Sequence, residues 1–457
     1  MARNRPLSYA RRNAALFLSE LKEFLRFPSV SSEPRHVGDL KRCAVWLRDH
    51  LQSIGLDDVR LLPTASNPIV YACWRHAVGR PTILIYGHYD VVPPGPVSEW
   101  RTPPFEPTTV GDDLYARGAC DDKGQLFLHV KALESYLRTS GRLPVNVKCI
   151  FEGEEEIGSP ELLRFIGRNK FPLRASAAVI SDTKMLGPEL PAISYSERGS
   201  LKLEWQVRGP HEELHSGTFG GAVHNPVQAL CEMIAKLHDA RGRIAIPGFY
   251  EDVRLSSDAE RAYLKRTGPT DGQILDAAGM SIGWGERGYT LYERTTTRPA
   301  LTVNSIAGGP GGPGVKSAIP ARAGVKLSFR LVPDQDPQRI EQLFRKHIAR
   351  ITPSGLQSRI RALSSAKPMT VDRHHPVFKA ASTAYRLGFG TAPVFVRSGG
   401  SIPVASAFQE IGIPPVLMGF GLPDDRIHGP NEKFHLPNFY RGIDTSIWFL
   451  AAAGAKL

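Results

Sequence analysis

Three adjacent glutamates, Glu154 to Glu156, directly follow the apolar segment VNVKCIF in this sequence. Neighbouring carboxylates repel one another, and removing them from water costs further free energy. The apolar segment has the composition of a buried strand. A buried strand that ends in three carboxylates predicts a compensating positive charge close by.

Six further side chains of metal-binding types follow other apolar segments or precede an expected helix: His88, Asp90, Asp121, Asp122, Asp182 and His428. The apolar segments are ILIY, AAVIS and PVLMGFG, which we expect to be strands of a parallel sheet. In such a sheet the carboxyl ends of the strands meet at one edge. We therefore expect these side chains to converge although they are far apart in the sequence.

Taken singly, each of these residues has an ordinary explanation. A histidine after a strand is often structural, an aspartate can cap a helix or form a turn, and a glutamate run can be solvated. Gathered without compensation, the carboxylates would cost several kcal/mol. Two divalent cations would remove that cost. Imidazole and carboxylate ligands without clustered cysteines suit zinc, and also manganese or cobalt.

The order of residues in GHYD gives Asp90 a separate role. Residues two apart in an extended segment point to the same side, so Asp90 can reach back to the ring of His88. A carboxylate commonly orients a metal-binding histidine in this way. We predict that Asp90 orients His88 and is not itself a ligand.

The surrounding elements predict an α/β protein with a second domain inserted into the first. Helical and apolar strand patterns alternate up to about residue 198 and return after residue 367. Between them, SLKLEWQVRG and ARAGVKLSFRLVPD alternate apolar and polar residues, which is typical of half-exposed antiparallel strands. We predict a catalytic domain formed by residues 1–198 and 368–457, with a mixed, mostly parallel sheet and helices on both faces. Residues 199–367 are expected to form an α+β domain.

The composition narrows the possible partners. The chain has 457 residues, of which 42% are hydrophobic and 22% are charged, as in soluble globular proteins of two or more domains. The net charge is +12, but the basic residues are spread out, so we expect no nucleic-acid partner. No stretch approaches 18 apolar residues, so we expect no membrane partner. The segment GGPGGPGVKS (308–317) is expected to be a turn-rich loop and not a phosphate-binding loop.

The N-terminus and the cysteines favour a cytoplasmic location. Phe17, Leu21 and Leu25 recur every four residues, which predicts an amphipathic helix that ends near Pro28. Charged residues interrupt the apolar positions, so the segment makes a poor signal peptide; an organelle transit peptide stays an alternative. The five cysteines are widely spaced and form no CxxC, which argues against a disulfide framework.

Eight segments together resemble a known family: GHYDVVP, LYARGACDDKG, EGEEEIGS, ISDT, LHSGTFGG, SFRLVPDQ, RSGGSIPV and HGPNEK. They lie between residues 87 and 433. The sequence is similar to the di-zinc aminoacylase and glutamate carboxypeptidase superfamily of metallopeptidases. Within it, the sequence most resembles the branch of the cytosolic nonspecific dipeptidase and carnosinase.

The resemblance implies a centre of two metal ions, with zinc favoured. Asp121 would bridge the ions. One ion would also bind His88 and Asp182, and the other Glu156 and His428. Glu155 would be the general base that takes a proton from the shared water, and Glu154 would be solvated or supporting. The Asp121–Asp122 peptide bond is expected to be cis.

The resemblance also assigns roles to the inserted domain, which would serve as a lid and a dimerisation domain. His215 would stabilise the oxyanion, within its own chain or across a homodimer. Arg330 would bind the carboxylate of the substrate, helped by Gly400 and Ser401 in the GGS segment. Without the resemblance, Arg330 would be an ordinary arginine on a strand surface, and GGS a plain turn.

These implications predict a metal-dependent amide hydrolase, most simply a dipeptidase or exopeptidase that cleaves short peptides with a free carboxylate. An N-acyl-amino-acid deacylase on the same scaffold is the alternative. A noncatalytic binding homologue is a third possibility. It predicts the loss of a metal ligand or of the base, yet all of these residues are present.

Overall fold

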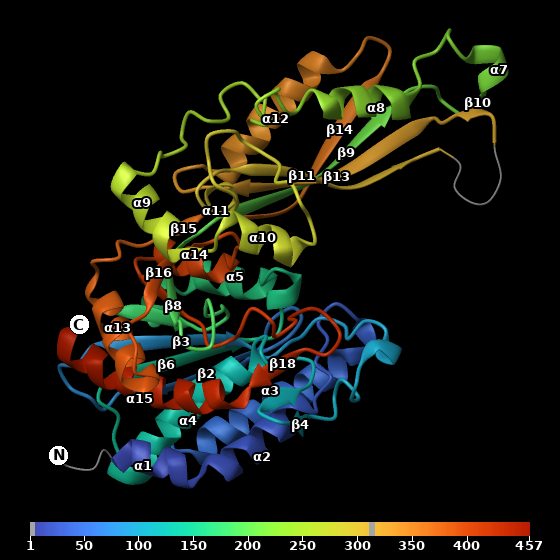
Figure 1. Cartoon of the computed structure of the whole chain (residues 1–457). Helices are drawn as coiled ribbons and strands as arrows, with labels where there is room; N and C mark the ends of the chain where they lie inside the picture. Colours follow the sequence, from blue (N-terminus) through green and yellow to red (C-terminus); the bar gives the residue numbers. More distant parts are fainter. Residues whose placement is uncertain (1–4, 310–315) are drawn as a thin grey trace. The chain divides into compact units, whose positions relative to one another are not determined.

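The computed structural model describes residues 5–309 and 316–457, which divide into two compact units (Figure 1). Unit 1 comprises residues 1–195, 371–396 and 403–457, and unit 2 comprises residues 196–370 and 397–402. The predicted segment 368–457 is thus interrupted, because residues 397–402 belong to unit 2. Most of the predicted loop 308–317 lies outside the described residues. The two units are described separately below.

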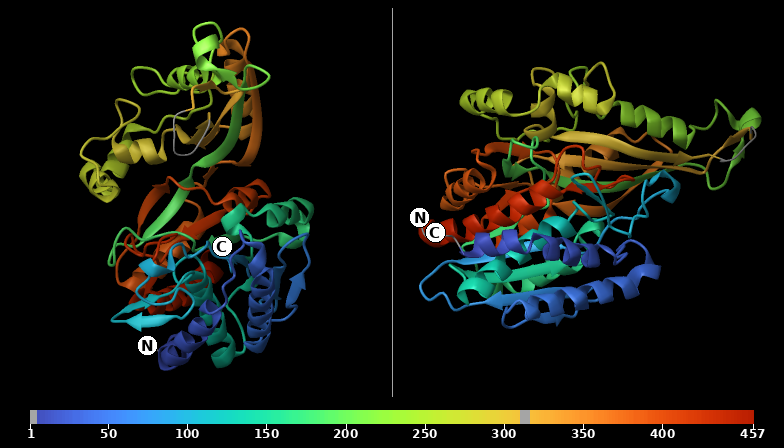
Figure 2. Two further views of the ribbon diagram at one scale, coloured as in Figure 1. Left: turned by 90° about the vertical axis from the view of Figure 1, so that its right-hand side faces the viewer. Right: turned by 60° about the horizontal axis from the view of Figure 1, so that its bottom comes forward.

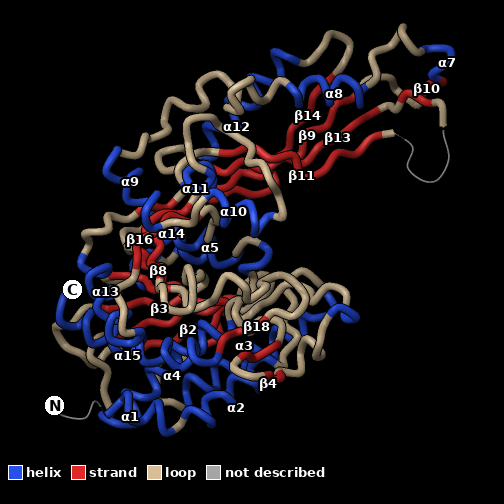
Figure 3. Tube along the Cα trace, in the orientation of Figure 1, coloured by secondary structure: helices blue, strands red, loops and turns tan. Residues whose placement is uncertain are grey.

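Unit 1 is built on a large sheet whose strands include, in spatial order, β1-β2-β6-β3-β7-β17-β8; β15 (Met369–Thr370) and β16 (Val394–Ser398) both pair with β8. Figure 3 shows the strands of the chain in red. The neighbours β6, β3, β7 and β17 are parallel, whereas β2 and β8 run antiparallel to the strands beside them. The bounds are β1 Arg60–Leu62, β2 Ile69–Trp74, β3 Thr82–His88, β6 Asn146–Glu152, β7 Ala177–Ile180, β8 Ala192–Glu197 and β17 Pro415–Met418. The prediction of a mixed sheet is confirmed, and its parallel part is limited to the four central strands β6, β3, β7 and β17.

Helices cover both faces of this sheet (Figures 1 and 2). On one face a single apolar core joins the sheet to helices α2, α3, α4, α13 and α15. On the other face lie α5 and α14, and the ring of Phe408 in α14 meets that of Tyr86 at 6.1 Å. The bounds are α1 Arg5–Arg12, α2 Ala14–Leu25, α3 Val37–Ser53, α4 Lys123–Ser140, α5 Pro160–Arg168, α6 Lys170–Leu173, α13 Pro376–Phe389, α14 Pro403–Glu410 and α15 Leu436–Lys456.

Two helices of unit 1, α2 and α4, illustrate how the local sequence determines their position. The predicted first helix corresponds to α2, which buries Phe17, Leu21 and Leu25 as expected. Helix α4 ends at Gly141, whose φ of 63° lies in the left-handed region that favours glycine. Both helices pack their apolar side chains into the core of unit 1.

A small antiparallel sheet in unit 1 brings together two segments that are more than 300 residues apart in sequence. Its order is β18-β5-β4, with bounds β4 Thr108–Val110, β5 Asp113–Tyr115 and β18 Lys433–His435. Lys433 pairs with Tyr115, and Ala116 N donates to Glu432 O at 3.2 Å just beyond the ladder. The chain that leaves β5 and the chain that enters β18 therefore run side by side.

Unit 2 contains an antiparallel sheet with the order β11-β13-β9-β14, covered on one face by α8 and α12. Burial alternates along β9 and β13, as the sequence predicted. The strands are β9 Gly199–Arg208, β10 Leu214–His215, β11 Ala300–Gly308, β12 Ala318–Ile319, β13 Arg322–Leu331, β14 Gln357–Ala366 and β15 Met369–Thr370; β16 (Val394–Ser398) crosses the unit boundary. The helices are α7 Ser216–Phe219, α8 Pro226–Ala235, α9 Asp258–Thr267, α10 Asp271–Ala278, α11 Leu291–Thr296 and α12 Pro337–Ile351.

All five cysteines are free thiols, and four of them are buried. Within the described ranges, no helix is both long enough and apolar enough to cross a membrane.

Candidate metal centre

The predicted side chains gather at the carboxyl edge of the large sheet in unit 1. Strand β3 ends at His88, and β6 ends at Glu152, two residues before the glutamate run. Strand β7 ends at Ile180, two residues before Asp182. Because these three strands are parallel, their ends lie at the same edge.

The first group that could hold a metal ion consists of His88, Asp121 and Asp182. His88 Nε2 lies 3.1 Å from Asp121 Oδ1 and 3.9 Å from Asp182 Oδ2. The donor atoms of the three residues all lie within 4.8 Å of one another. The set has one imidazole and two carboxylates, and it contains the three residues that the resemblance implies for this ion.

The second group consists of Asp121, Glu156 and His428. His428 Nε2 lies 3.0 Å from Asp121 Oδ2 and 3.2 Å from Glu156 Oε2. Asp121 belongs to both groups and turns a different oxygen to each histidine. This is the arrangement expected of a bridging carboxylate. The predicted cis peptide bond between Asp121 and Asp122 is confirmed.

Asp90 connects the two ends of the centre. Its backbone oxygen lies 3.0 Å from His88 Nδ1, and its carboxylate accepts hydrogen bonds from the backbone N–H groups of Glu155 and Glu156, both at 3.2 Å. When Nδ1 of His88 donates to Asp90, Nε2 presents its lone pair to the first group. The predicted contact of the Asp90 carboxylate is present, since Oδ1 lies 3.3 Å from His88 Nδ1, but the backbone oxygen of Asp90 lies closer to this nitrogen. The orienting role itself stays a prediction.

At two positions of this edge the backbone packs so closely against neighbouring side chains that only glycine fits. A Cβ on Gly153 would lie 2.5 Å from the buried ring of Tyr89, so the turn before the glutamate run requires glycine. A Cβ on Gly87 would lie 2.9 Å from Asp122 Oδ2, which accepts the backbone N–H of His88 at 3.2 Å. Larger residues at either position would displace the segments that carry the candidate ligands.

The charges of the centre are unbalanced. Burial, together with repulsion by Asp121, raises the pKa of Asp182 to about 7. Hydrogen bonds to Asp121 and Glu156 raise the pKa of His428 to about 10. Burial alone would raise the pKa of Asp121, but hydrogen bonds from His428 and His88 hold it below its ordinary value. Among the described residues, these carboxylates form ion pairs only with His88 and His428, which must bind protons before they carry a positive charge.

Two buried oxygens in the centre also lack hydrogen-bond partners, Glu156 Oε1 and Asp122 Oδ1. A buried carboxylate oxygen without a partner is costly. Divalent cations among the two groups would neutralise the carboxylates and would give Glu156 Oε1 a partner. The residues therefore fit two divalent cations bound by nitrogen and oxygen.

The three glutamates of the run have different surroundings. Burial, followed by the charge of Asp182, raises the pKa of Glu155 well above its ordinary value. Glu154 is buried and accepts backbone N–H groups from Asn67 at 3.3 Å and from Glu161 at 3.2 Å. Of its two expected roles, Glu154 has the supporting one and is not solvated. Glu156 is the member of the run in the second group.

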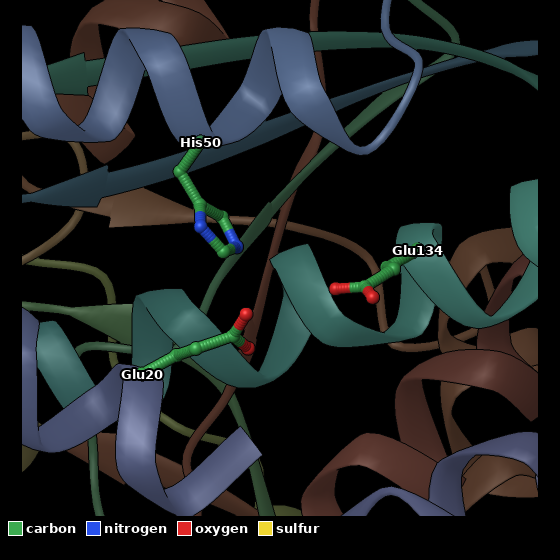
Figure 4. A group of neighbouring side chains, drawn as sticks. All are labelled: Glu20, His50 and Glu134. Atoms are coloured by element: carbon green, nitrogen blue, oxygen red, sulfur yellow. The ribbon is translucent and has the colours of Figure 1, made fainter. Parts of the chain in front are cut away.

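A third group of this composition has a different explanation. The donor atoms of Glu20, His50 and Glu134 point toward one another from three helices of unit 1 (Figure 4). The ammonium nitrogen of Lys131 lies 2.5 Å from Glu20 Oε2, 2.7 Å from Glu134 Oε2 and 2.8 Å from His50 Nε2. The three donors are thus already bound to a cation that belongs to the chain. We exclude this group, named here the lysine cluster, as a metal site.

The predicted substrate-binding residues lie in unit 2. Arg330, on β13, donates through Nη1 to Ser401 Oγ at 2.9 Å, and Gly400 N donates to Ser398 Oγ at 3.1 Å. His215 is exposed on β10, and its Nδ1 accepts the N–H of Gly217 at 3.1 Å. The structure thus brings Arg330 and Ser401 together, while their roles toward a substrate stay predictions.

The sequence alone did not identify three residues that support these segments. Arg198 holds the GGS segment, since its Nε donates to Gly399 O at 3.1 Å. Arg117 and Glu432 form a buried ion pair beside the second group. Arg117 lies in the segment LYARGACDDKG and Glu432 in the segment HGPNEK, each four residues from an expected metal ligand. Their opposite charges at these positions could have indicated an ion pair.

Two known proteins are similar to the chain over most of its length. The chain is 30% identical over 453 residues to the Cys-Gly metallodipeptidase DUG1 of Candida albicans, covering 94% of this chain and 93% of that protein. It is also 30% identical over 446 residues to the Beta-Ala-His dipeptidase of Rattus norvegicus, covering 93% and 90%.

A solved structure has the same fold. The M20 family metallo-carboxypeptidase Sso-CP2 from Sulfolobus solfataricus superposes with a TM-score of 0.88 at 33% identity, covering 96% of this chain and 99% of that one. The sequence profile of Peptidase family M20/M25/M40 matches residues 84–450. Fold, candidate ligands and relatives agree, and the chain belongs to peptidase family M20/M25/M40.

Proposed function

We propose that this protein is a metal-dependent dipeptidase that uses two divalent ions, with Zn²⁺ favoured over Mn²⁺ and Co²⁺. One ion would be held by His88, Asp121 and Asp182, and the other by Asp121, Glu156 and His428. A single observation carries the proposal: Asp121 turns Oδ1 to His88 at 3.1 Å and Oδ2 to His428 at 3.0 Å. A carboxylate in this position supports a pair of ions rather than one.

The chain supplies the acid–base chemistry. When bound, the ions would polarise the scissile carbonyl and lower the pKa of water. Glu155 would accept a proton from the attacking water and pass it to the leaving amine. Glu155 is close enough to His88 and Asp182 of the first group for their charges to act on it, which supports this role. Asp90 would keep His88 oriented and would hold the backbone of Glu155.

The substrate would be a short peptide with a free carboxylate. In this proposal Arg330 binds the carboxylate, Gly400 and Ser401 assist it, and His215 stabilises the developing oxyanion. An exopeptidase is supported by relatives named Cys-Gly metallodipeptidase and Beta-Ala-His dipeptidase and by a structure named a metallo-carboxypeptidase. Because these names differ, the permitted length of the peptide must be tested directly.

We also propose that the protein is a cytoplasmic homodimer. Strand β11 forms one edge of the sheet in unit 2 and, among the described residues, pairs only with β13. Val303 and Ile306 on this strand are 39% and 50% exposed. An exposed edge with apolar side chains is suited to pairing with a second copy. The free thiols support a reducing compartment.

The proposal is tested by metal reconstitution. The protein is stripped with a chelator and reloaded with Zn²⁺, Mn²⁺ or Co²⁺. Amine release is then followed from dipeptides, tripeptides, longer peptides and N-acyl amino acids. Glu155→Gln should bind two ions and lose at least about 10²-fold in kcat, as expected for a general base. The matched control is Glu154→Gln, which removes the neighbouring carboxylate from the same run and should retain cleavage.

The substrate panel separates the alternatives. Metal-restored cleavage of dipeptides that is lost in Glu155→Gln supports the dipeptidase. Cleavage of N-acyl amino acids alone would replace it with a deacylase. Two bound ions without cleavage of any substrate would favour a noncatalytic homologue, and failure to bind metal would contradict the proposed centre itself.

A further inference from the structure

A buried ion pair lies directly behind the second metal group. Arg117 is 1% exposed and Glu432 is completely buried, and Arg117 Nη1 donates to Glu432 Oε2 at 2.6 Å. Neither residue has a donor atom in the two candidate metal groups. A buried ion pair often contributes little net stability, so its retention next to a reactive centre calls for another explanation.

Glu432 holds the backbone that leads to Asp121. Its Oε1 accepts the N–H groups of Cys120 at 2.9 Å and of Asp121 at 3.0 Å, and its Oε2 accepts that of Gly118 at 3.0 Å. One carboxylate therefore receives three backbone hydrogen bonds from a single loop. This loop carries the carboxylate that belongs to both metal groups.

The same pair also holds the loop that carries His428. Glu432 lies four residues after His428, and Arg117 Nη2 donates to Gly429 O at 3.1 Å. The backbone of Glu432 is fixed as well, since its oxygen accepts the N–H of Ala116 at 3.2 Å. These contacts extend the β5–β18 ladder into the two loops.

The geometry points to Glu432 as a positioning residue. We propose that the buried Glu432 carboxylate, paired with Arg117, fixes the Asp121 loop against the His428 loop and thereby sets the affinity of the second metal group. This inference rests on the proposed metal centre and goes beyond it, because it assigns the distance between Asp121 and His428 to a residue that binds no metal. Groups that support metal ligands in this way typically change metal affinity by about 10- to 100-fold.

The test compares Glu432→Gln with a matched ion pair in unit 2. Glu286 and Arg298 are both buried and are joined by two hydrogen bonds of 2.8 Å each. Glu286→Gln therefore makes the same chemical change in a buried ion pair of the other unit. Glu432→Asp keeps the charge opposite Arg117 but is one carbon shorter, so it should lose part of the N–H contacts.

Metal affinity is measured with Zn²⁺ against a chromogenic chelator, and the ligand field is read from the absorption spectrum of the Co²⁺-loaded protein. We expect Glu432→Gln to lower the affinity for one of the two ions by about 10- to 100-fold and to alter the Co²⁺ spectrum. Glu432→Asp should have a smaller effect in the same direction. Glu286→Gln should leave both readouts unchanged, even where the unfolding transition moves.

The outcomes distinguish the possible failures. A folded Glu432→Gln or Glu432→Asp with wild-type affinity for both ions overturns the positioning role. If Glu432→Gln does not fold, Glu432→Asp carries the test. Equal losses in Glu432→Gln and Glu286→Gln would also overturn it, because general destabilisation would then be the cause. A wild-type protein that binds no metal would instead contradict the proposed centre.

Discussion

The lysine cluster and the candidate metal centre use the same kinds of donor atoms for different ends. Each contains groups of one imidazole and two carboxylates whose donor atoms lie within 4.8 Å of one another. In the lysine cluster the ammonium of Lys131 lies among the donors. In the metal centre, no lysine or arginine of the described part of the chain forms an ion pair with the candidate ligands, whose carboxylates pair only with His88 and His428. The two groups of this centre share Asp121.

The pKa values of the histidines in the two sites differ accordingly. Burial and the charge of Lys131 lower the pKa of His50 to about 3, whereas hydrogen bonds to Asp121 and Glu156 raise that of His428 to about 10. The two histidines thus shift in opposite directions. Where the chain provides its own cation, the histidine stays neutral. Where it does not, the site attracts positive charge from outside, first as protons and then as metal ions.

The largest effect is expected from a substitution of Asp121, the ligand that both groups of the metal centre share. Asp121→Asn removes the charge that both metal groups share while it preserves the shape of the side chain. We expect the loss of at least one bound ion and a fall of at least ~10³-fold in kcat/KM, which corresponds to about 4 kcal/mol. Metal content and initial rates measure the effect. Full activity with two ions bound would show that Asp121 is not a bridging ligand.

The corresponding substitution in the lysine cluster is Lys131→Met, which removes the cation of that cluster. It leaves Glu20 and Glu134 without their shared partner, and such losses cost about 3–5 kcal/mol of the free energy of unfolding. Urea unfolding of the metal-loaded protein measures this cost. The number of bound metal ions should stay at two. If the variant bound an additional ion, the lysine cluster would be a metal site after all.

Proton release on metal binding would sharpen the comparison. His428 has a pKa of about 10, so it is protonated at pH 7, and a metal ion must displace that proton. The apparent affinity should therefore rise with pH, by about 1.4 kcal/mol per pH unit for each displaced proton. Calorimetry in buffers of different ionisation enthalpy counts the protons. No release at pH 7 would contradict the assigned protonation.

The smallest expected effect concerns His50. Its pKa is lowered from 6.5 to about 3 in the folded protein, so the unfolded chain binds more protons between these values. The free energy of unfolding therefore falls as pH falls from 6.5 towards 3. His50→Gln keeps an acceptor for Lys131 but does not titrate. It should flatten this slope by about 1 kcal/mol per pH unit, as measured by urea unfolding between pH 6 and 4. An unchanged slope would show that His50 is protonated in the folded state.

The metal centre was predictable because it follows from strand direction. Parallel strands that end in His88, before Glu155 and before Asp182 must bring these residues to one edge. The resemblance to the family assigned the ligand roles of Asp121 and His428, which lie on loops whose course the strand pattern does not determine. The mixed sheet and the insertion of an antiparallel sheet follow from similar periodicities.

The lysine cluster could not be predicted in the same way. Glu20, His50 and Lys131 lie on three helices, where charged residues ordinarily face solvent, and helix packing alone brings them together. Strand β11 was missed for a related reason. Most of its residues are exposed on both faces, so its sequence lacks the alternation that identified β9 and β13.

The metal centre has a closed side and an open side, which should govern how fast ions exchange. The side chain of His88 is completely buried, whereas that of His428 is 55% exposed. An ion held beside His428 can therefore dissociate and be replaced more quickly than one held beside His88 and Asp182. Brief exposure to a dilute chelator should first produce a singly loaded protein, and fluctuations in metal supply would reach the enzyme through its open side.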